Sequence, residues 1–280
     1  MVRSNFNLRG LDMTTAELIK AGKLLEARQL LVQEVKAAPA DLGKRTALCQ
    51  VLCFCGEWDK AERHLDAIST QDPKRETGVL VYRNLIQAER ERLEVLQLRH
   101  RPAFLTEAPP WIDTFWAGLE KIAENLQEEA ETLFLEANAA QAAVSGTVNQ
   151  TPFSGISNTD SRISCFLEAF VHERYIWIPF VSIREMIISP PKTLMDLLWV
   201  SANITAWSGL TMNCFLPVLY AASFSHENER IRLGQMTDWQ ALCGPFAKGA
   251  GQQVFQIGET DMALLEIREM LCTAPACNRP

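Results

Sequence analysis

The residues with the clearest potential for chemistry form the run Lys248-Gly249-Ala250-Gly251. Two glycines beside a lysine could form a loop that cradles a phosphate group. However, no Lys-Ser or Lys-Thr pair follows the last glycine, as it would in a Walker motif, and no third glycine completes a dinucleotide fingerprint. We therefore interpret the run as a turn that enters a strand formed by the following residues, QQVFQIG.

The remaining candidate catalytic residues are scattered along the chain. Ser154 lies in the run FSGIS, which is not the G-x-S-x-G elbow of hydrolases. His172 has no identifiable nucleophile beside it, and Asp238 is a residue type that often caps a loop. Because no nucleophile, base and oxyanion donors come together, we predict that the chain is not an enzyme and needs no cofactor. The alternative is an enzyme or small-ligand module in the C-terminal part of the chain, built from Asp238, Lys248 and the nearby glycines.

The cysteines and histidines do not show the spacing of a metal site. The chain has 8 cysteines and 4 histidines, but no C-x-x-C pair occurs. Cys49 and Cys53 are four residues apart in an apolar helical stretch, so they share one helix face. The first residues lack the apolar segment of a secretory signal. We expect reduced thiols, no bound metal and a cytoplasmic location.

The charge distribution excludes some classes of partner. The formal net charge is −7, which gives no electrostatic basis for binding nucleic acid. Residues 102–140 hold one lysine and eight acidic residues, a pattern typical of a solvated helix face. The apolar stretch 194–224 contains Asp196, Asn203 and Pro217, which a bilayer would disfavour, so we predict a β-hairpin there and no membrane span.

The N-terminal part of the chain contains an internal repeat. A shift of 34 positions superposes three pairs of identical residues: Gly22 with Gly56, Ala27 with Ala61, and Pro39 with Pro73. This period is typical of stacked helix–turn–helix units of the tetratricopeptide type. The glycine ends a first helix, the alanine lets a second helix approach closely, and the proline stops that second helix. A plain helical bundle is the alternative.

The flanking patterns predict how the repeat begins and ends. Thr14 and Glu17 have the spacing of a capping box before a short first helix. Residues 76–98 are predicted to form one longer helix that covers the last repeat. A further long helix is predicted over residues 111–142, because apolar residues recur there every three or four positions.

The composition changes to Gly, Ser, Thr, Asn and Pro over residues 144–162, where we place a domain boundary. Aromatic and β-branched runs then predict strands, with hairpins around Ser208-Gly209 and near residue 259. One or two helices are expected beside them, the first over 162–171. The predicted fold class is therefore multidomain α and α+β. A TPR-like all-helical domain (1–143) and a linker (144–162) precede a small, mainly antiparallel α+β domain (163–280).

Several motifs in this order resemble one protein family. They are GEWDKAERHL before QDP, Asp160-Ser161-Arg162, YIWIPF, PPKTLMDLLW, FLPVLY, TDW and KGAGQQ. Together they resemble the ImpE/SciE/TagJ family, accessory proteins of bacterial type VI secretion. The resemblance implies a non-catalytic adaptor that binds the N-terminal helix of the small subunit of the contractile sheath. It also implies a link to the ATPase that disassembles the sheath.

Stacked repeats expose a concave groove, lined by their first helices, in which a partner helix can lie. Counting from the matched glycines, we expect seven residues to line this groove: Ile19, Lys20, Gln50, Phe54, Leu80, Asn84 and Gln87. The alternative is that the apolar members of this set are core residues. A second possible docking surface is the seam between the domains near Trp111, Phe115 and Trp116.

Overall fold

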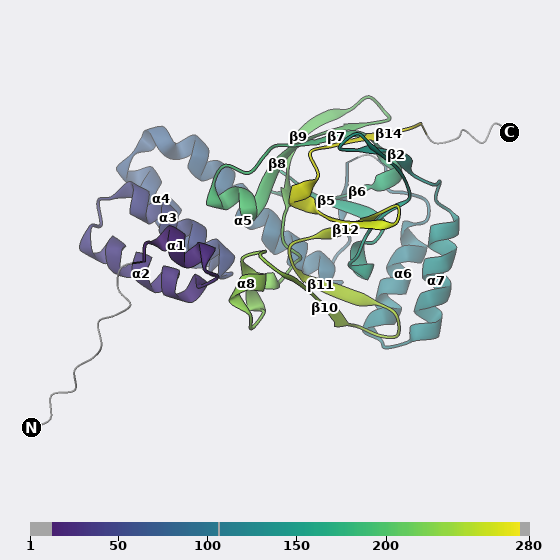
Figure 1. Ribbon diagram of the computed structural model, residues 1–280, viewed down its shortest axis with the longest axis horizontal. Helices are drawn as coiled ribbons and strands as arrows, with labels where there is room; N and C mark the ends of the chain where they lie inside the picture. The colour runs from purple at the N-terminus through teal and green to yellow at the C-terminus, as the bar shows by residue number, and fades with distance from the viewer. Residues whose placement is uncertain (1–12, 106, 275–280) are drawn as a thin grey trace, which may run out of the picture.

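Antiparallel helix pairs form the N-terminal third of the chain in the computed structural model, which describes residues 13–105 and 107–274 (Figure 1). Helix α1 packs on α2, α3 packs on α2 and α4, and α5 packs on α4. Their bounds are α1 Thr15–Lys20, α2 Leu24–Ala37, α3 Leu42–Phe54, α4 Trp58–Gln71 and α5 Glu76–Leu96. The predicted TPR-like helical region is confirmed, as are the short first helix and the single long helix that follows the second pair.

The capping box, the glycines and the alanines of the repeats lie in the structural positions predicted for them. Thr14 and Glu17 form a capping box at the start of α1. Gly22 and Gly56 have φ angles of 79° and 69°, in the left-handed region that glycine adopts most easily. Both matched alanines, Ala27 and Ala61, are completely buried in the second helix of their pair.

Residues 111–142 form two helices, so the prediction of one long helix is wrong. Helices α6 (Ile112–Ala123) and α7 (Gln127–Ala139) are joined by a turn in which Asn125 has a φ of 59°. Asparagine tolerates this left-handed conformation better than most residues. The completely buried Ala130 follows Asn125 by five positions, the same interval that separates glycine from alanine in the two repeats.

Helices α6 and α7 pack against the sheet, on the side away from α1–α4 (Figure 1). Phe115 of α6 makes edge-on contacts with Phe134 of α7 and with Phe166 and Trp177 of the sheet, at ring-centroid distances of 5.0, 5.2 and 6.2 Å. The predicted helical domain, residues 1–143, is therefore divided in space. Its last two helices contribute to the core of the sheet region.

The largest sheet in the described residues has nine strands, in the order β1-β6-β5-β9-β8-β7-β14-β2-β3. Neighbouring strands are antiparallel except for the parallel pair of β1 and β6. The bounds are β1 Ala103–Phe104, β2 Ser145–Val148, β3 Thr151–Ser154, β5 Phe166–Val171, β6 Arg174–Pro179, β7 Ile183–Ile188, β8 Trp199–Ala206, β9 Thr211–Pro217 and β14 Glu269–Cys272. The predicted mainly antiparallel sheet is confirmed.

Two smaller sheets complete this part of the chain. One pairs β10 with β11, and the other has the order β13-β12-β4. Their strands are β4 Ile156–Asn158, β10 Thr237–Ala241, β11 Ala247–Gly251, β12 Val254–Ile257 and β13 Thr260–Ala263. The predicted hairpins are confirmed in the pairs β8–β9 and β12–β13.

Three local predictions differ from the structure. Residues 144–162, expected to be a linker, contain β2, β3 and β4, each paired within a sheet. The helix expected over 162–171 is mostly strand β5, whose first five residues, Phe166 to Phe170, are buried on both faces. The run Lys248–Gly251 belongs to strand β11 and is not a turn.

The sheet region also contacts the turns of the helical repeats. Short elements after β9, η5 (Ser223–Ser225) and α8 (Glu229–Arg232), lie beside α2 and α4. A Cβ atom on Gly22 would lie 2.5 Å from Cγ of Arg230, and one on Gly56 would lie 2.4 Å from the ring of Phe224. The two repeat glycines therefore allow both the turn and this close contact.

Candidate functional site

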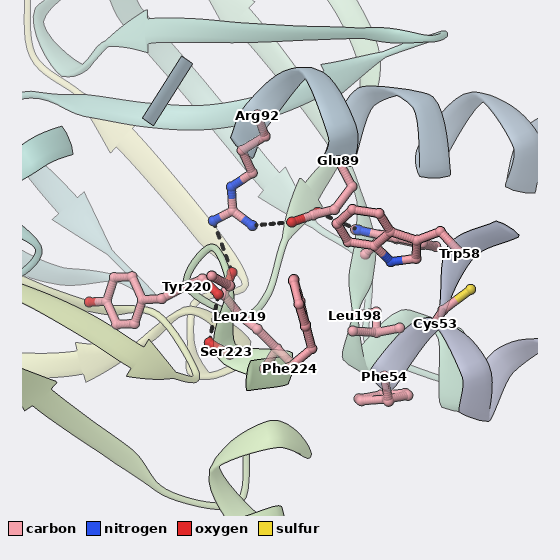
Figure 2. A pocket seen from close by; sticks show the side chains of 12 residues that line it. Cys53, Phe54, Trp58, Glu89, Arg92, Leu198, Leu219, Tyr220, Ser223 and Phe224 are labelled. Atoms are coloured by element: carbon pink, nitrogen blue, oxygen red, sulfur yellow. Dashed lines mark hydrogen bonds and ion pairs between the residues drawn. The ribbon is translucent and has the colours of Figure 1, made fainter. Parts of the chain in front are cut away.

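A buried polar network joins α5 to the sheet, and Figure 2 shows the part of it in which Arg92 contacts Glu89 and Leu219. The Arg92 guanidinium donates to both carboxylate oxygens of Glu168, at 2.8 and 2.5 Å, and to Glu89 at 3.0 Å. It also donates to the Leu219 carbonyl at 2.9 Å. The indole N–H of Trp199 reaches the other oxygen of Glu89 at 3.1 Å. Every charge in the network is therefore paired or hydrogen-bonded, as burial requires.

Further partners surround Glu168 on the sheet side. The Tyr175 hydroxyl donates to Glu168 Oε1, and the Gln253 amide donates to Glu168 Oε2, at 2.5 and 2.8 Å. Burial and the nearby Glu168 carboxylate raise the pKa of Tyr175 well above its ordinary value. Burial acts to lower the pKa of Arg92, but the charges of Glu168 and Glu89 outweigh it and raise that pKa. The tyrosine thus stays protonated and the arginine charged.

This network has little room for a ligand. The cavity beside it has a volume of about 30 Å³ and lies between α3, α5, β8 and the segment Leu219–Phe224. That volume holds about one or two water molecules. We interpret the network as a structural connection between the helices and the sheet.

The predicted groove residues divide into covered and open positions. Phe54 is only 1% exposed and lines the small cavity next to the sheet, so we do not retain it as a partner contact. Ile19 is half-buried, and the carbonyls of Ile19 and Lys20 accept hydrogen bonds from the Gln235 amide, at 2.8 and 3.5 Å. Gln50 is also half-buried. The sheet region therefore covers the C-terminal ends of the first helices.

Lys20 is exposed at the end of α1, and the other open positions lie on α5. Leu80 is 51% exposed, Gln87 is exposed and Asn84 is half-buried. Residues spaced by four and three positions lie on one helix face, so these three side chains form a continuous stripe. Leu80 is more exposed than any other large apolar residue in the described part of the helical repeats.

Two pockets on the helical repeats were not predicted. One, of about 590 Å³, includes Leu31, Glu34 and Lys44, and the other, of about 250 Å³, includes Leu65, Ile68 and Gly78. Each named residue of the second pocket follows its counterpart in the first by 34 positions. The pockets are therefore repeat-related, and the 34-residue period was the signal that could have revealed them.

The second docking surface considered from the sequence is part of the core. Trp111, Phe115 and Trp116 are 6%, 0% and 3% exposed. Their rings pack against one another and against Phe166 and Trp177 of the sheet. These side chains stabilise the packing of α6 on the sheet and offer little surface to a partner.

The residues of the alternative enzyme hypothesis do not form a catalytic set. His226 Nε2 lies 3.5 Å from Asp238 Oδ2, and its Nδ1 accepts the backbone N–H of Asn228 at 3.0 Å. Ser154 and His172 are exposed, on β3 and in the turn between β5 and β6. In residues 13–105 and 107–274 no three His, Cys, Asp or Glu side chains are grouped to hold a metal ion. None of the helices described there is both long and apolar enough to cross a bilayer.

The architecture defines the class of protein. The protein is one in which TPR-like helix pairs precede a mainly antiparallel sheet domain, and a buried ion-pair network connects the two parts. Comparison with known proteins gives the family. A family model described as ImpE protein matches residues 150–271.

One relative and one solved structure extend the comparison over most of the chain. Over 258 residues the chain is 31% identical to the type VI secretion system accessory component TagJ of Pseudomonas aeruginosa, covering 92% of this chain and 90% of that protein. The fold is similar to the crystal structure of protein VPA1032 from Vibrio parahaemolyticus, with a TM-score of 0.82 and 20% identity, over 92% of this chain and 97% of the other. The chain belongs to the ImpE/TagJ family of type VI secretion accessory components, and the resemblance seen in its motifs is confirmed.

Proposed function

We propose that the chain is a non-catalytic, cytoplasmic adaptor that binds a helical segment of another type VI secretion component through the α5 stripe. The observation that carries this proposal is the exposure of Leu80, Asn84 and Gln87 on one face of a helix that is otherwise well packed. An amphipathic helix recognises such a surface through apolar anchors flanked by amide hydrogen bonds.

The N-terminal helix of the small sheath subunit is the partner we propose. Membership of a family of secretion accessory components supports a protein partner within that system. A stripe of three residues on one helix face is long enough for a short amphipathic helix to lie against it. The ATPase that disassembles the sheath is a second proposed partner, which this adaptor would bring to the sheath. The side chains of Lys20, which is exposed, and Gln50, which is half-buried, would contact the end of the bound helix.

Calorimetric titration with a peptide of that sheath helix, from the same bacterium, tests the proposal. Leu80→Asp with Gln87→Ala should weaken binding by about 2 kcal/mol, or roughly 30-fold, if these residues are hot spots. The double variant should fold normally, since both side chains are exposed. Leu135→Asp, on α7 outside the repeats and 70% exposed, is the matched control and should bind as the unmodified protein does. Equal affinity of the folded double variant and the control would exclude the α5 stripe.

A further inference from the structure

Two cavities meet at Arg162 and Lys248. One has a volume of about 400 Å³ and the other of about 430 Å³, and both side chains line both cavities. The larger cavity lies where α5 ends, beside the end of α6 and the β10–β11 hairpin. In Figure 1 the ribbon of this hairpin extends to the lower end of α6. Both volumes are in the range of small-molecule sites.

The two cavities differ in polarity. The 400 Å³ cavity is bordered by polar groups that include His226, Glu227 and Gln240. The 430 Å³ cavity has an apolar wall formed mainly by Leu98, Leu119, Ile122 and Leu242. Among residues 13–105 and 107–274, no acidic side chain lines this second cavity, and Arg162 and Lys248 are the charged groups in its wall.

Arg162 is held in place with one amino group free. Its Nε and Nη2 donate to the two oxygens of Asp160 at 3.0 and 2.6 Å, and Asp160 is 1% exposed. The backbone N–H of Gly249 also donates to Asp160, at 3.1 Å. Nη1 of Arg162 makes no hydrogen bond to the described residues. It is also not among their buried unpaired atoms, of which Arg45 Nε is the only one, so Nη1 faces open space.

Lys248 is half-buried, and no carboxylate of the described residues forms an ion pair with it. The ends of α5 and α6 border the cavity, and carbonyls in the last turn of each helix accept hydrogen bonds from the residues that follow. The Leu98 N–H donates to the Val95 carbonyl at 2.9 Å, and the Asn125 N–H donates to the Ile122 carbonyl at 3.0 Å. The Lys248 ammonium group is therefore available to an anion, and a charge-assisted hydrogen bond to it would lower the free energy of binding.

We propose that the 430 Å³ cavity binds a small amphipathic anion, with a carboxylate between Arg162 and Lys248 and an apolar group against Leu98, Leu119, Ile122 and Leu242. Two cations at one end and an apolar wall without acidic residues match this chemistry. The carboxylate can come from a free aliphatic acid or from the C-terminal residue of a polypeptide. The site is separate from the α5 stripe and does not depend on it.

Saturation-transfer NMR titrations with the full chain test this site. Octanoate is one probe, with octanol as its uncharged counterpart. A pentapeptide ending in leucine is the other, with the C-terminally amidated peptide as its counterpart. For ligands of this size we expect Kd values on the order of 1 mM. Lys248→Met should raise Kd about 10- to 100-fold, because it removes a charge-assisted hydrogen bond.

Two further variants keep the test decisive. Leu242→Gln changes the apolar wall instead of the cation and should also weaken binding. Lys192→Met removes an exposed lysine outside the cavity and should leave Kd unchanged. Lys248-dependent binding of octanoate supports a free acid as the ligand, and binding of only the free-carboxyl peptide supports a polypeptide terminus. The proposal is overturned if neither probe saturates, if octanol binds as tightly as octanoate, or if Lys248→Met and Lys192→Met bind equally.

Discussion

Arg92→Met should cause a large loss of stability, because it breaks the network between α5 and the sheet. The Arg92 side chain is 2% exposed and that of Glu168 is 0% exposed. The guanidinium makes four hydrogen bonds, to Glu168, Glu89 and the Leu219 carbonyl. Methionine fills much of the same space, so most of the loss comes from the carboxylates that remain without a cation.

The expected magnitude follows from that unpaired charge. Removing one partner of a buried ion pair costs about 3–5 kcal/mol. Domains are stable by only about 5–15 kcal/mol, so the variant should lose a large part of its stability. Arg90→Met is the matched control, two residues away on the same helix. The Arg90 side chain is 30% exposed and pairs with Glu62 and Asp59, so its loss should cost less than about 1 kcal/mol.

The measurement is the free energy of unfolding in urea. Tryptophan fluorescence monitors the unfolding of the sheet, and far-ultraviolet circular dichroism monitors that of the helices. A second substitution tests the charge argument directly. Glu168→Gln should destabilise the unmodified protein but should stabilise Arg92→Met, because it removes an unpaired charge and leaves an acceptor for Tyr175. If Arg92→Met loses no more stability than Arg90→Met, or if Glu168→Gln makes the variant worse, the ion-pair explanation is wrong.

Two further predictions concern the helical repeats. Gly56→Ala should destabilise the protein by more than about 1 kcal/mol, because of its positive φ and the contact with Phe224. Gly78→Ala, in α5 with open space around it, should instead stabilise by about 0.5–1 kcal/mol, and thermal unfolding of both variants checks this contrast. The hydrogen bond from Arg28 lowers the pKa of Glu57 below its ordinary value of 4.5, so the carboxylate stabilises the fold above that pH. This contribution is lost as the pH falls through the lowered value, so urea midpoints should depend less on acid pH in Glu57→Gln than in the unmodified protein.

The helical repeat was predictable because its signals are local. A capping box, a glycine and a proline act within a few residues. In the structure the capping box and the positive-φ glycines are present, and Pro39 and Pro73 directly follow the C-caps of α2 and α4. The pair α6–α7 was missed because Asn125 replaces glycine at the turn. A repeat defined by identical residues excludes this turn, which requires only a residue that tolerates a positive φ. The interval of five positions to a buried alanine was present in the sequence and could have identified this pair.

The sites were less predictable because they depend on contacts between distant parts of the chain. Phe54 has the right spacing for a groove residue, but the sheet region covers it. Arg162 and Lys248 are 86 positions apart in sequence, and only the folded chain brings them to one cavity. The glycines beside Lys248 indicated a turn, whereas in the structure Lys248 and these glycines belong to strand β11.

The covered turns explain why α5 is the helix best placed to meet a partner. In a free repeat array the turns between paired helices face solvent, but here α8 and η5 lie against them. The Leu25 N–H at the start of α2 donates to Glu229 at 2.7 Å, so the sheet region even supplies the cap of a repeat helix. Helix α5 has no following helix to cover Leu80 and its stripe, while its opposite face carries Glu89 and Arg92 into the buried network. A helix that binds the stripe would therefore contact an element fixed to the sheet, and a tilt of α5 would have to break hydrogen bonds made by Arg92.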